Sequence, residues 1–548
     1  MAVSAPTQQP ATGRAGSPDG PDDVLADVVV VGAGFAGLYA RYRFRELGLS
    51  VVGVEDAPDV GGTWYWNRYP GARCDVPSLF YSYSWSPELR AEWRWTEKYA
   101  SQAEILDYAR YAADRFGLRP LIRFSTRVTD AAFDEASDRW TVRTDTGETI
   151  RATYCIMATG CLSVPNEVAL PGLEDFAGPT YHTARWPHEP VGFTGLRVGV
   201  VGTGSSAIQL IPVVAEDAAQ LTVFQRTPNF SVPARNGPLD QADEDRFVRT
   251  FDVYLAGLES PDFGRVGTAA FDAPVPPVDV QRARYERLWE QGGGAILLAY
   301  PNLLTEPAVN DVAAEFVRDR IRSIVTDPVT AEALCPTGYP IGVKRICVDS
   351  GYYATFNQPN VALVDLQRDP IESVLADGVR TASGTVGLDA LILATGFDAM
   401  TGALARIDFR GRNGVTLREA WAEGPRTYLG VAMAGFPNLF VITGPGSPSV
   451  IGNVIHNGEH HVDWIAGCIA HGRNRGASRI EADARAEAAW MDHVAEAAGR
   501  TLFPKANSWY LGANIEGKPR VFMPYVGQGY RHRCATIAAD GYRGFRFD

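Results

Sequence analysis

The sequence predicts an α/β fold with two dinucleotide-binding, Rossmann-like domains and a helical insertion in the second of them. A glycine-rich turn follows an apolar strand at Gly32, and a second turn of the same kind follows another apolar strand at Gly202. Between residues 237 and 334 neither pattern recurs, and this stretch instead contains segments typical of helices. Because 548 residues exceed what one hydrophobic core usually supports, several domains are expected.

The first turn has every element of a dinucleotide-binding unit. Residues 27–31 end in four valines, a run suited to a strand that is buried on both faces. The turn over residues 32–37 opens a helix over residues 38–49, so backbone N–H groups can face a pyrophosphate without an intervening Cβ. A lone motif could be a plain tight turn, but here an acid follows the next strand, where it can accept hydrogen bonds from ribose hydroxyls. The predicted contacts are Gly32, Gly34, Ala36, Gly37 and Glu55.

The second turn differs from the first at the end of its second strand. Its own turn spans residues 202–207, with alanine in place of the third glycine, which helix–strand packing tolerates. Where the first domain has an acid, this one has Gln225-Arg226-Thr227. A carboxylate would repel a 2′-phosphate, whereas a guanidinium can bind one; a solvated strand-end charge is the competing interpretation. We therefore expect FAD in the first domain and NADPH in the second, with contacts from Gly202, Thr203, Gly204, Ser205, Ser206, Arg226 and Thr227.

The chain is expected to cross between the two domains. Apolar strands ending in Ala-Thr-Gly occur at residues 156–160 and 391–396, and such exits suit a protein with two nucleotide domains. Helices that open with a capping Asp are expected at Asp243–Leu258, Asp279–Gln291 and Asp311–Val325. After a disordered tail (1–23), the predicted order is a first FAD-binding segment (24–160), a first NADPH-binding segment (161–236), the helical insertion (237–334), a second NADPH-binding segment (335–389) and a second FAD-binding segment (390–548).

Composition excludes several classes of function. The net charge of −13 argues against a nucleic-acid binder, which needs a basic surface to neutralise phosphates. Seven cysteines without a CxxC pair give neither a disulfide framework nor a zinc site, and they favour a reducing, cytoplasmic setting. No apolar run is long enough to cross a bilayer. His456, His460 and His461 lack cysteine or carboxylate partners at ligand spacing, so no metal site is expected. The protein is expected to be a monomer.

Several longer motifs resemble the flavin-dependent Baeyer–Villiger monooxygenases, from about residue 24 to the C-terminus. Residues 176–187 match the F-x-G-x-x-x-H-x-x-x-W-P fingerprint, and residues 61–75 match a second signature with G-x-W, Y-P-G and an Asp. A Lys-Arg pair at 344–345 precedes Asp-Ser-Gly-Tyr-Tyr at 349–353, as it does in that family. The motifs at 66–75, 396–404 and 444–449 are most similar to the phenylacetone, steroid and cyclohexanone monooxygenases.

The resemblance implies which residues form the site. Those implied to contact FAD are Thr63, Trp64, Tyr65, Trp66, Asp75, Tyr81, Val128 and Val454. Those implied to contact NADP are Arg73, Cys74, Lys344, Arg345 and Trp509, and the substrate pocket is bordered by Ser449, Val450 and Ile451. The chain departs from the family pattern at Val454, Glu516 and Gln528.

The resemblance also implies a reaction. NADPH reduces FAD, dioxygen adds to flavin C4a, and the resulting peroxyflavin attacks a ketone to give an ester or lactone. Arg345 is then the catalytic arginine, because a cation that never deprotonates can stabilise negative charge on oxygen in a dry site. Asp75 orients it, and the cofactor performs the bond chemistry, so no side-chain nucleophile is needed. On this interpretation the 176–187 fingerprint connects domains: Gly178 permits a bend, and His182 and Trp186 are anchors.

Three other functions are consistent with nucleotide turns. A flavin monooxygenase that oxidises amines or sulfides shares both turns, but it lacks the context of Arg345. A disulfide reductase would need a cysteine pair after the first turn, which this chain does not have. A non-enzymatic nucleotide-binding scaffold or redox sensor leaves the Asp75 and Arg345 pair unexplained. Bound yellow flavin and ketone-stimulated use of NADPH and oxygen separate the oxygenase from a scaffold.

Overall fold

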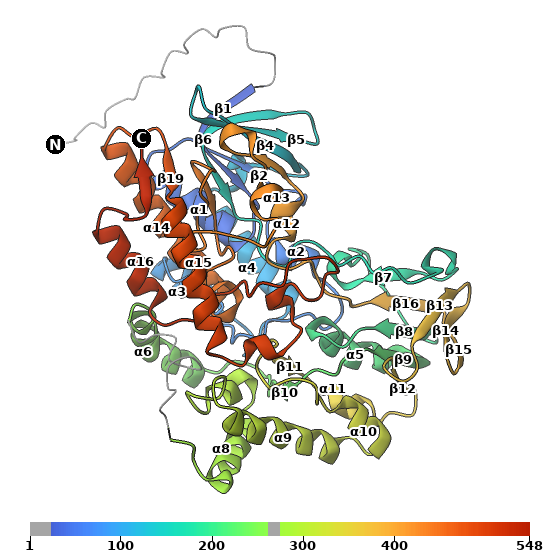
Figure 1. The fold of residues 1–548 in the computed structure, drawn as a ribbon. Helices are drawn as coiled ribbons and strands as arrows, with labels where there is room; N and C mark the ends of the chain where they lie inside the picture. Colours follow the sequence, from blue (N-terminus) through green and yellow to red (C-terminus); the bar gives the residue numbers. More distant parts are fainter. Residues whose placement is uncertain (1–22, 261–273) are drawn as a thin grey trace, which may run out of the picture.

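The computed structural model describes residues 23–260 and 274–548, and its larger sheet carries the first nucleotide turn (Figure 1). The strand order is β17-β4-β5-β6-β1-β2-β3. On one edge of β6, β5 pairs with residues 149–152 and β18 pairs with residues 155–157, so two strands share that edge. The bounds are β1 (Asp23–Val31), β2 (Val51–Val54), β3 (Ile122–Arg123), β4 (Val128–Asp134), β5 (Arg139–Thr144), β6 (Thr149–Met157), β17 (Asp408–Arg410) and β18 (Leu439–Val441).

The valine run of β1 is buried on both faces, as its sequence predicts. Val28 and Val30 belong to one hydrophobic cluster, and Val29 and Val31 belong to another on the opposite face. Helices α1 (Phe35–Glu46) and α14 (Val454–Asn474) contribute to the first of these clusters. Of the predicted tail, residues 1–22 lie outside the described residues. Asp23, its last residue, begins β1.

The second sheet is parallel throughout and carries the second nucleotide turn, with order β12-β9-β8-β16-β7. The predicted domain boundary at residues 389/390 is wrong, because β16 lies between β8 and β7 in this sheet. A four-residue apolar strand does not reveal from its sequence which sheet it joins. The chain returns to the first sheet only at β17. The bounds are β7 (Thr180–His182), β8 (Arg197–Val201), β9 (Gln220–Gln225), β12 (Val361–Asp365) and β16 (Ala390–Leu393), with α5 (Ser205–Asp217) after the turn.

The insertion is helical, but its helices begin earlier than predicted. Asp240 caps α6 through the backbone N–H of Asp243, and Glu306 caps α9, whose first residue is a proline. The predicted capping Asp residues 243, 279 and 311 therefore lie within the helices. The bounds are α6 (Gln241–Leu258), α8 (Val278–Gln291), η4 (Gly293–Leu298), α9 (Pro307–Ile324) and α10 (Pro328–Leu334).

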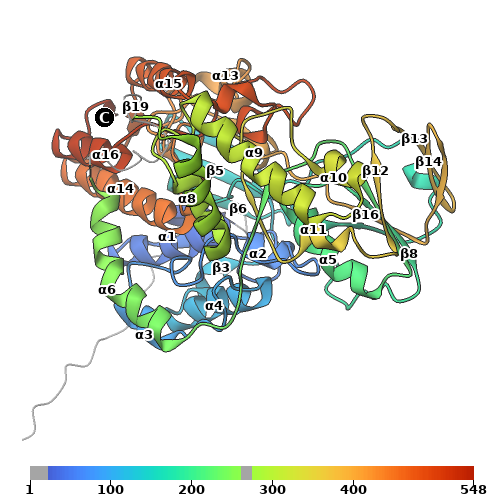
Figure 2. The ribbon, with the colours of Figure 1, turned by 90° about the horizontal axis from the view of Figure 1, so that it is seen from below.

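The insertion is divided between the two domains. Tyr285 and Phe316, from α8 and α9, share a core with Val200 of the second sheet. Helix α6 instead packs on the first domain, where the ring of Phe80 lies 5.2 Å from Phe247 and 5.1 Å from Tyr254. Figure 2 shows α6 near α3, away from α10. The expectation that the whole insertion belongs to the NADPH domain is therefore wrong for α6, because its aromatic face finds a partner in the first domain.

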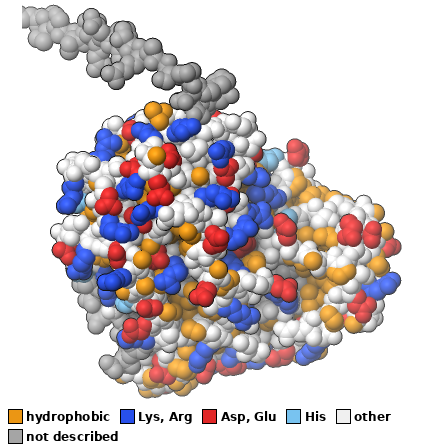
Figure 3. Space-filling view, turned by 45° about the horizontal axis from the view of Figure 1, so that its top comes forward, with side chains coloured by type: hydrophobic (Ala, Val, Ile, Leu, Met, Phe, Trp, Pro, Cys, Tyr) orange, Lys and Arg blue, Asp and Glu red, His pale blue; other side chains and the backbone are white. Residues whose placement is uncertain are grey.

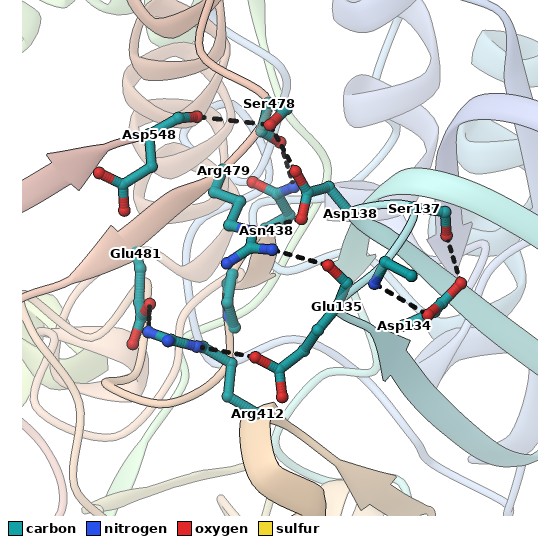
Figure 4. Close-up of polar contacts among 12 residues, drawn as sticks. Asp134, Glu135, Ser137, Asp138, Arg412, Asn438, Ser478, Arg479, Glu481 and Asp548 are labelled. Atoms are coloured by element: carbon teal, nitrogen blue, oxygen red, sulfur yellow. Dashed lines mark hydrogen bonds and ion pairs between the residues drawn. The ribbon is translucent and has the colours of Figure 1, made fainter.

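A two-stranded C-terminal sheet is tied to the first sheet by a polar cluster (Figure 4). Arg479 donates to the backbone oxygen of Glu135 in the β4–β5 turn at 2.7 Å. Arg412 bridges the Glu135 carboxylate at 3.4 Å and the buried Glu481 carboxylate at 3.1 Å. In this small sheet β19 (Ile480–Ala482) pairs antiparallel with β20 (Phe545–Phe547), and α15 and α16 lie between the two strands in the sequence.

The remaining elements surround the two sheets. The small strands are β10 (Ser231–Pro233), β11 (Cys347–Asp349), β13 (Ile371–Leu375), β14 (Gly378–Thr381) and β15 (Gly384–Gly387). The remaining helices are α2 (Thr63–Trp66), α3 (Pro87–Glu92), α4 (Gln102–Arg115), α11 (Tyr352–Thr355), α12 (Gly402–Ala405), α13 (Leu417–Ala420), α15 (Ala484–Gly499) and α16 (Tyr530–Ala539). The short 3-10 turns are η1 (Arg119–Leu121), η2 (Leu173–Asp175), η3 (Thr183–Arg185), η5 (Arg412–Gly414), η6 (Ser449–Ile451), η7 (Phe503–Lys505) and η8 (Trp509–Leu511).

The surface carries charges of both signs. On the face shown in Figure 3, acidic and basic side chains are interspersed rather than segregated into separate patches. Among the helices of the described residues, none combines the length and the apolar character needed to span a bilayer.

Candidate active site

The first nucleotide turn joins β1 to α1 through close backbone approaches. Gly32 has φ 102°, and a Cβ there would lie 2.4 Å from the backbone oxygen of Ala158. Gly34 caps α1, and a Cβ on Gly62 would lie 2.9 Å from the Gly34 Cα atom. The turn therefore exposes its N–H groups without side chains, a cradle that fits a dinucleotide diphosphate. Ala36 and Gly37 follow in the first turn of α1.

Glu55 holds the first turn in a way that the sequence pattern did not predict. Its Oε2 accepts a hydrogen bond from Ala33 N at 2.5 Å, and its Oε1 accepts one from Ala57 N at 2.8 Å. Burial raises the pKa of Glu55, and these two backbone bonds oppose that rise. Its contact with a ribose stays a prediction.

The aromatic residues of α2 point in two directions. Trp64 donates to the hydroxyl of Tyr81 at 3.0 Å, so these two predicted flavin contacts lie together. The guanidinium of Arg185 lies 4.3 Å from the ring centre of Trp66, a cation–π contact that links the two domains. The ring of Tyr65 lies 5.0 Å from that of His188 and 5.1 Å from that of Trp66. Thr63 begins this helix.

The second nucleotide turn joins β8 to α5 and has the same backbone geometry. Gly202 has φ 115°, and a Cβ there would lie 2.5 Å from the backbone oxygen of Ala394. The hydroxyl of Thr203 donates to the backbone oxygen of Thr227 at 2.8 Å, so these predicted contacts lie together. Gly204 caps α5, whose first two residues are Ser205 and Ser206.

A loop of the first domain packs against α5, beside the second turn. The hydroxyl of Tyr69 donates to Gln209 Oε1 at 2.9 Å, and Gln209 Nε2 donates to the backbone oxygen of Arg73 at 3.0 Å. The Arg73 guanidinium points away, to Glu97 at 2.8 Å. Gln209 was missed because a buried amide at a helix–loop contact has no local sequence pattern.

Two cations lie near each other at the second turn. Arg226 is exposed, and it lies close enough to Lys344 for their charges to interact. Burial lowers the pKa of Lys344, and the charge of Arg226 lowers it further. Among the described carboxylates, none forms an ion pair with either residue. A pair of uncompensated cations fits the 2′-phosphate of NADPH.

Arg345 and Asp75, which are far apart in the sequence, form a two-point ion pair. Arg345 Nε donates to Asp75 Oδ2 at 2.6 Å, and Nη2 donates to Oδ1 at 2.7 Å. The attraction of Asp75 raises the pKa of Arg345 despite burial. Burial alone would raise the pKa of Asp75, but Arg345 holds it below its usual value. Both groups are therefore charged over the physiological pH range.

The ion pair is connected to the predicted substrate segment. Arg345 Nη1 donates to the backbone oxygen of Val450 at 2.6 Å, within η6. Ser449 is fully buried, Val450 is buried, and Ile451 is 37% exposed, so only the last offers much surface. Tyr510 adjoins Arg345: burial raises its pKa to about 12, and the Arg345 charge opposes the rise. Trp509 contacts Tyr510 at 4.3 Å between ring centres, and Cys74 is buried beside Asp75.

The 176–187 fingerprint forms the edge strand β7 and the turn η3, so it belongs to the second sheet and is more than a connector. His182 Nδ1 accepts a hydrogen bond from Ala184 N at 3.0 Å, and its Nε2 lies 3.2 Å from Thr395 Oγ1. Trp186 is buried beside Tyr181. Gly178 is needed for a close approach rather than a bend, because a Cβ there would lie 2.3 Å from the Asp389 backbone oxygen.

Two predicted flavin contacts are the first residues of elements in the first domain. Val128 begins β4 and packs in the core with Val54. Val454 is the first residue of α14 and is partly buried. The described ranges contain no group of three or more His, Cys, Asp or Glu side chains placed to hold a metal ion. His461 instead accepts a hydrogen bond from Thr443 N at 2.9 Å.

The two glycine turns define a protein with two dinucleotide-binding domains. An acid lies beside the first turn, and cations lie beside the second. A family profile described as pyridine nucleotide-disulphide oxidoreductase matches residues 29–236. All seven cysteines of this chain are free, so the match reflects the nucleotide-binding fold.

Comparisons over the whole chain are more specific. A Baeyer-Villiger monooxygenase from Pseudooceanicola batsensis is 40% identical, over 94% of this chain and 95% of its own. A solved structure of oxidized steroid monooxygenase bound to NADP is 50% identical, with TM-score 0.89 over 96% of this chain and 99% of its own. A structure of OTEMO in complex with FAD and NADP is 39% identical, with TM-score 0.90 over 95% of this chain and 99% of its own.

The chain belongs to the Baeyer–Villiger monooxygenases. It is an FAD-containing, NADPH-dependent enzyme with the two-domain fold predicted from its nucleotide turns. The predicted family, fold class and cofactors are therefore confirmed. The roles of individual site residues stay predictions.

Proposed function

We propose that this enzyme converts ketones to esters or lactones, with Arg345 as the catalytic cation and Asp75 as the carboxylate that positions it. When bound, FAD and NADPH supply the hydride and oxygen chemistry. The chain itself must fix positive charge where negative charge develops on oxygen, and it must exclude water there.

The observation that carries the proposal is the fixed guanidinium. Two hydrogen bonds to Asp75 and one to the Val450 backbone use three of the five N–H donors of Arg345, which leaves two for other partners. Asp75 prevents rotation of the guanidinium, and Val450 links its position to the segment proposed to border the substrate. A lysine could not make this planar contact and could lose its proton when desolvated.

We assign the two turns on the same basis. The cradle of Gly32, Gly34 and Gly62 supports FAD binding at the first turn. The cations Arg226 and Lys344 support recognition of the NADPH 2′-phosphate at the second. Trp509 and Tyr510 lie on a short turn beside Arg345 and would contribute to covering the site.

We further infer that the enzyme works as a monomer in the cytoplasm. The seven free cysteines suit a reducing compartment. Size-exclusion chromatography with light scattering tests the monomer, and fractionation of the host cell tests the compartment.

The test of function is product analysis on the purified full-length protein. Flavin absorbance should show bound FAD, and a panel of aromatic, cyclic and steroidal ketones should stimulate NADPH and oxygen consumption with ester or lactone formed. Sulfides and amines belong in the same panel. Oxidation of these heteroatoms without any ester from a ketone would contradict the proposal and favour the amine or sulfide oxygenase.

A further inference from the structure

Arg41, on the second turn of α1, is fully buried beneath the first nucleotide turn. Its Nη1 donates to the backbone oxygen of Gly32 at 2.7 Å, and its Nη2 donates to that of Val30 at 3.0 Å. Its Nε has no hydrogen-bond partner. Burying a guanidinium costs free energy, so its presence needs an explanation beyond filling space.

Arg41 and Glu55 hold one peptide group from opposite sides. Arg41 binds the oxygen of Gly32, and Glu55 binds the N–H of Ala33 at 2.5 Å. These two atoms belong to the same trans peptide and point in opposite directions. The plane of the peptide at the centre of the turn is therefore fixed by a cation on one side and an anion on the other.

A glycine in the neighbouring strand makes room for the guanidinium. A Cβ on Gly53 would lie 2.2 Å from Arg41 Nε, whereas a Cβ on Gly37 would first meet the backbone oxygen of Gly32, at 2.0 Å, and then Arg41 Nη1, at 2.9 Å. Gly53 is in the middle of β2, where a larger side chain would normally pack better. The arginine and the strand glycine therefore occur as a matched pair.

In the second domain the equivalent space beneath the turn is filled by apolar side chains rather than by a charged one. With Gly202 placed on Gly32, Ile211 takes the place of Arg41, Val223 that of Gly53, and Gln225 that of Glu55. Ile211 and Val223 are fully buried, and the Gln225 amide donates to the backbone oxygen of Ala333 instead of holding the turn. Apolar packing is thus sufficient for this strand–turn–helix fold, so stability alone does not account for Arg41.

We propose that Arg41 is a positioning residue of the FAD site, which rests on the assignment of FAD to the first turn. Together with Glu55 it fixes the Gly32–Ala33 peptide, and it places a buried positive charge under the turn that receives the diphosphate. A charge in the protein interior is weakly screened and favours a bound anion more than a surface charge does. Because burial lowers the pKa of Arg41 only to about 10, the group stays charged at neutral pH.

The test grafts the packing of the second turn onto the first. The double variant Arg41→Ile/Gly53→Val of the full-length chain is compared with wild type after removal of flavin, with Ile211→Val as the matched control in the second turn. The melting temperature, the Kd for FAD, the Kd for riboflavin and the Kd for NADP+ are measured. We expect FAD to bind at least tenfold more weakly, with little change for riboflavin, which lacks the diphosphate, or for NADP+.

Two results would overturn the proposal: an unchanged Kd for FAD, or equal weakening of FAD and riboflavin, which a purely structural role predicts. If the double variant does not fold, Arg41→Lys and Arg41→Gln replace it. Lysine keeps the charge and should bind FAD more tightly than glutamine, and the reverse order would refute the electrostatic role. The wild-type flavin spectrum and ketone products test the proposed function independently of these variants.

Discussion

At the first nucleotide turn two buried charges, Arg41 and Glu55, hold a peptide group, whereas at the second the equivalent positions are the uncharged Ile211 and Gln225. The second turn has its charge elsewhere, on the exposed Arg226 and on the neighbouring Lys344. The backbone of the two turns is nevertheless alike, with a left-handed glycine at the end of each first strand. The two turns therefore share one backbone conformation and differ in where their charge lies, in the interior at the first turn and beyond the second strand at the second.

Among the changes that compare the two turns, the largest expected effect comes from removing the glycine that both turns share. Gly32→Ala and Gly202→Ala each put a Cβ within 2.5 Å of a backbone oxygen, at a positive φ. The strain is on the order of 1–3 kcal/mol or more, because the backbone cannot move aside freely. Gly32→Ala should be purified with less than about a tenth of the wild-type FAD, judged by absorbance. Gly202→Ala should remain yellow and raise the KM for NADPH. Equal loss of FAD from both variants would contradict the assignment of FAD to the first turn and NADPH to the second.

A smaller and more selective effect is expected from Arg226→Ala. Loss of a charged hydrogen bond to the 2′-phosphate, about 1.5–3 kcal/mol, should lower kcat/KM for NADPH by about 10- to 100-fold. The value for NADH should change little. Arg368→Ala is the matched control, because Arg368 is an exposed arginine beside the same sheet, paired with Asp365. An equal loss with NADPH and NADH would remove Arg226 from the phosphate site.

The smallest expected effect is a change in pH dependence. The pKa of Lys344 is lowered by burial and by Arg226, so its charge is lost at a lower pH than that of an ordinary lysine. Affinity for NADPH should therefore be highest near neutral pH, where the 2′-phosphate is ionised and Lys344 is charged, and should fall as pH rises through this lowered pKa. Lys344→Arg should flatten the profile because arginine stays protonated. The check is NADP+ affinity by titration from about pH 6 to 10, a range that spans the ordinary lysine pKa; identical profiles would remove Lys344 from the site.

The nucleotide turns could be predicted from sequence because their signals are local. A strand, a glycine turn, a helix and one strand-end residue lie within about two dozen positions. The hydrogen bonds that Glu55 accepts from the turn backbone do not follow from this pattern. The Arg345–Asp75 pair could be predicted only through family resemblance, since its members lie on distant segments. Its bond to Val450 and its neighbour Tyr510 depend on tertiary packing, which no local pattern reports.

Other predictions were wrong, and one buried residue was missed, for similar physical reasons. The assignment of β16 to the first domain failed because a short apolar strand fits either sheet. The docking of α6 on the first domain depends on Phe80, whose partners are not evident from its own sequence context. Arg41 did leave a signal: a charged residue on α1 where the second turn has isoleucine, with a glycine in the paired strand. Comparing the two turns position by position would have revealed it.

The catalytic role of Arg345 can be tested most directly by counting ester molecules formed per NADPH oxidised in Arg345→Ala. The variant should be compared at full FAD occupancy, with Arg345→Lys beside it and the best ketone of the panel as substrate. Loss of the cation where negative charge develops on oxygen should reduce ester formation per NADPH by about 10²- to 10³-fold, while reduction of the flavin by NADPH persists. Ester formation per NADPH equal to that of the wild type would contradict the role of Arg345.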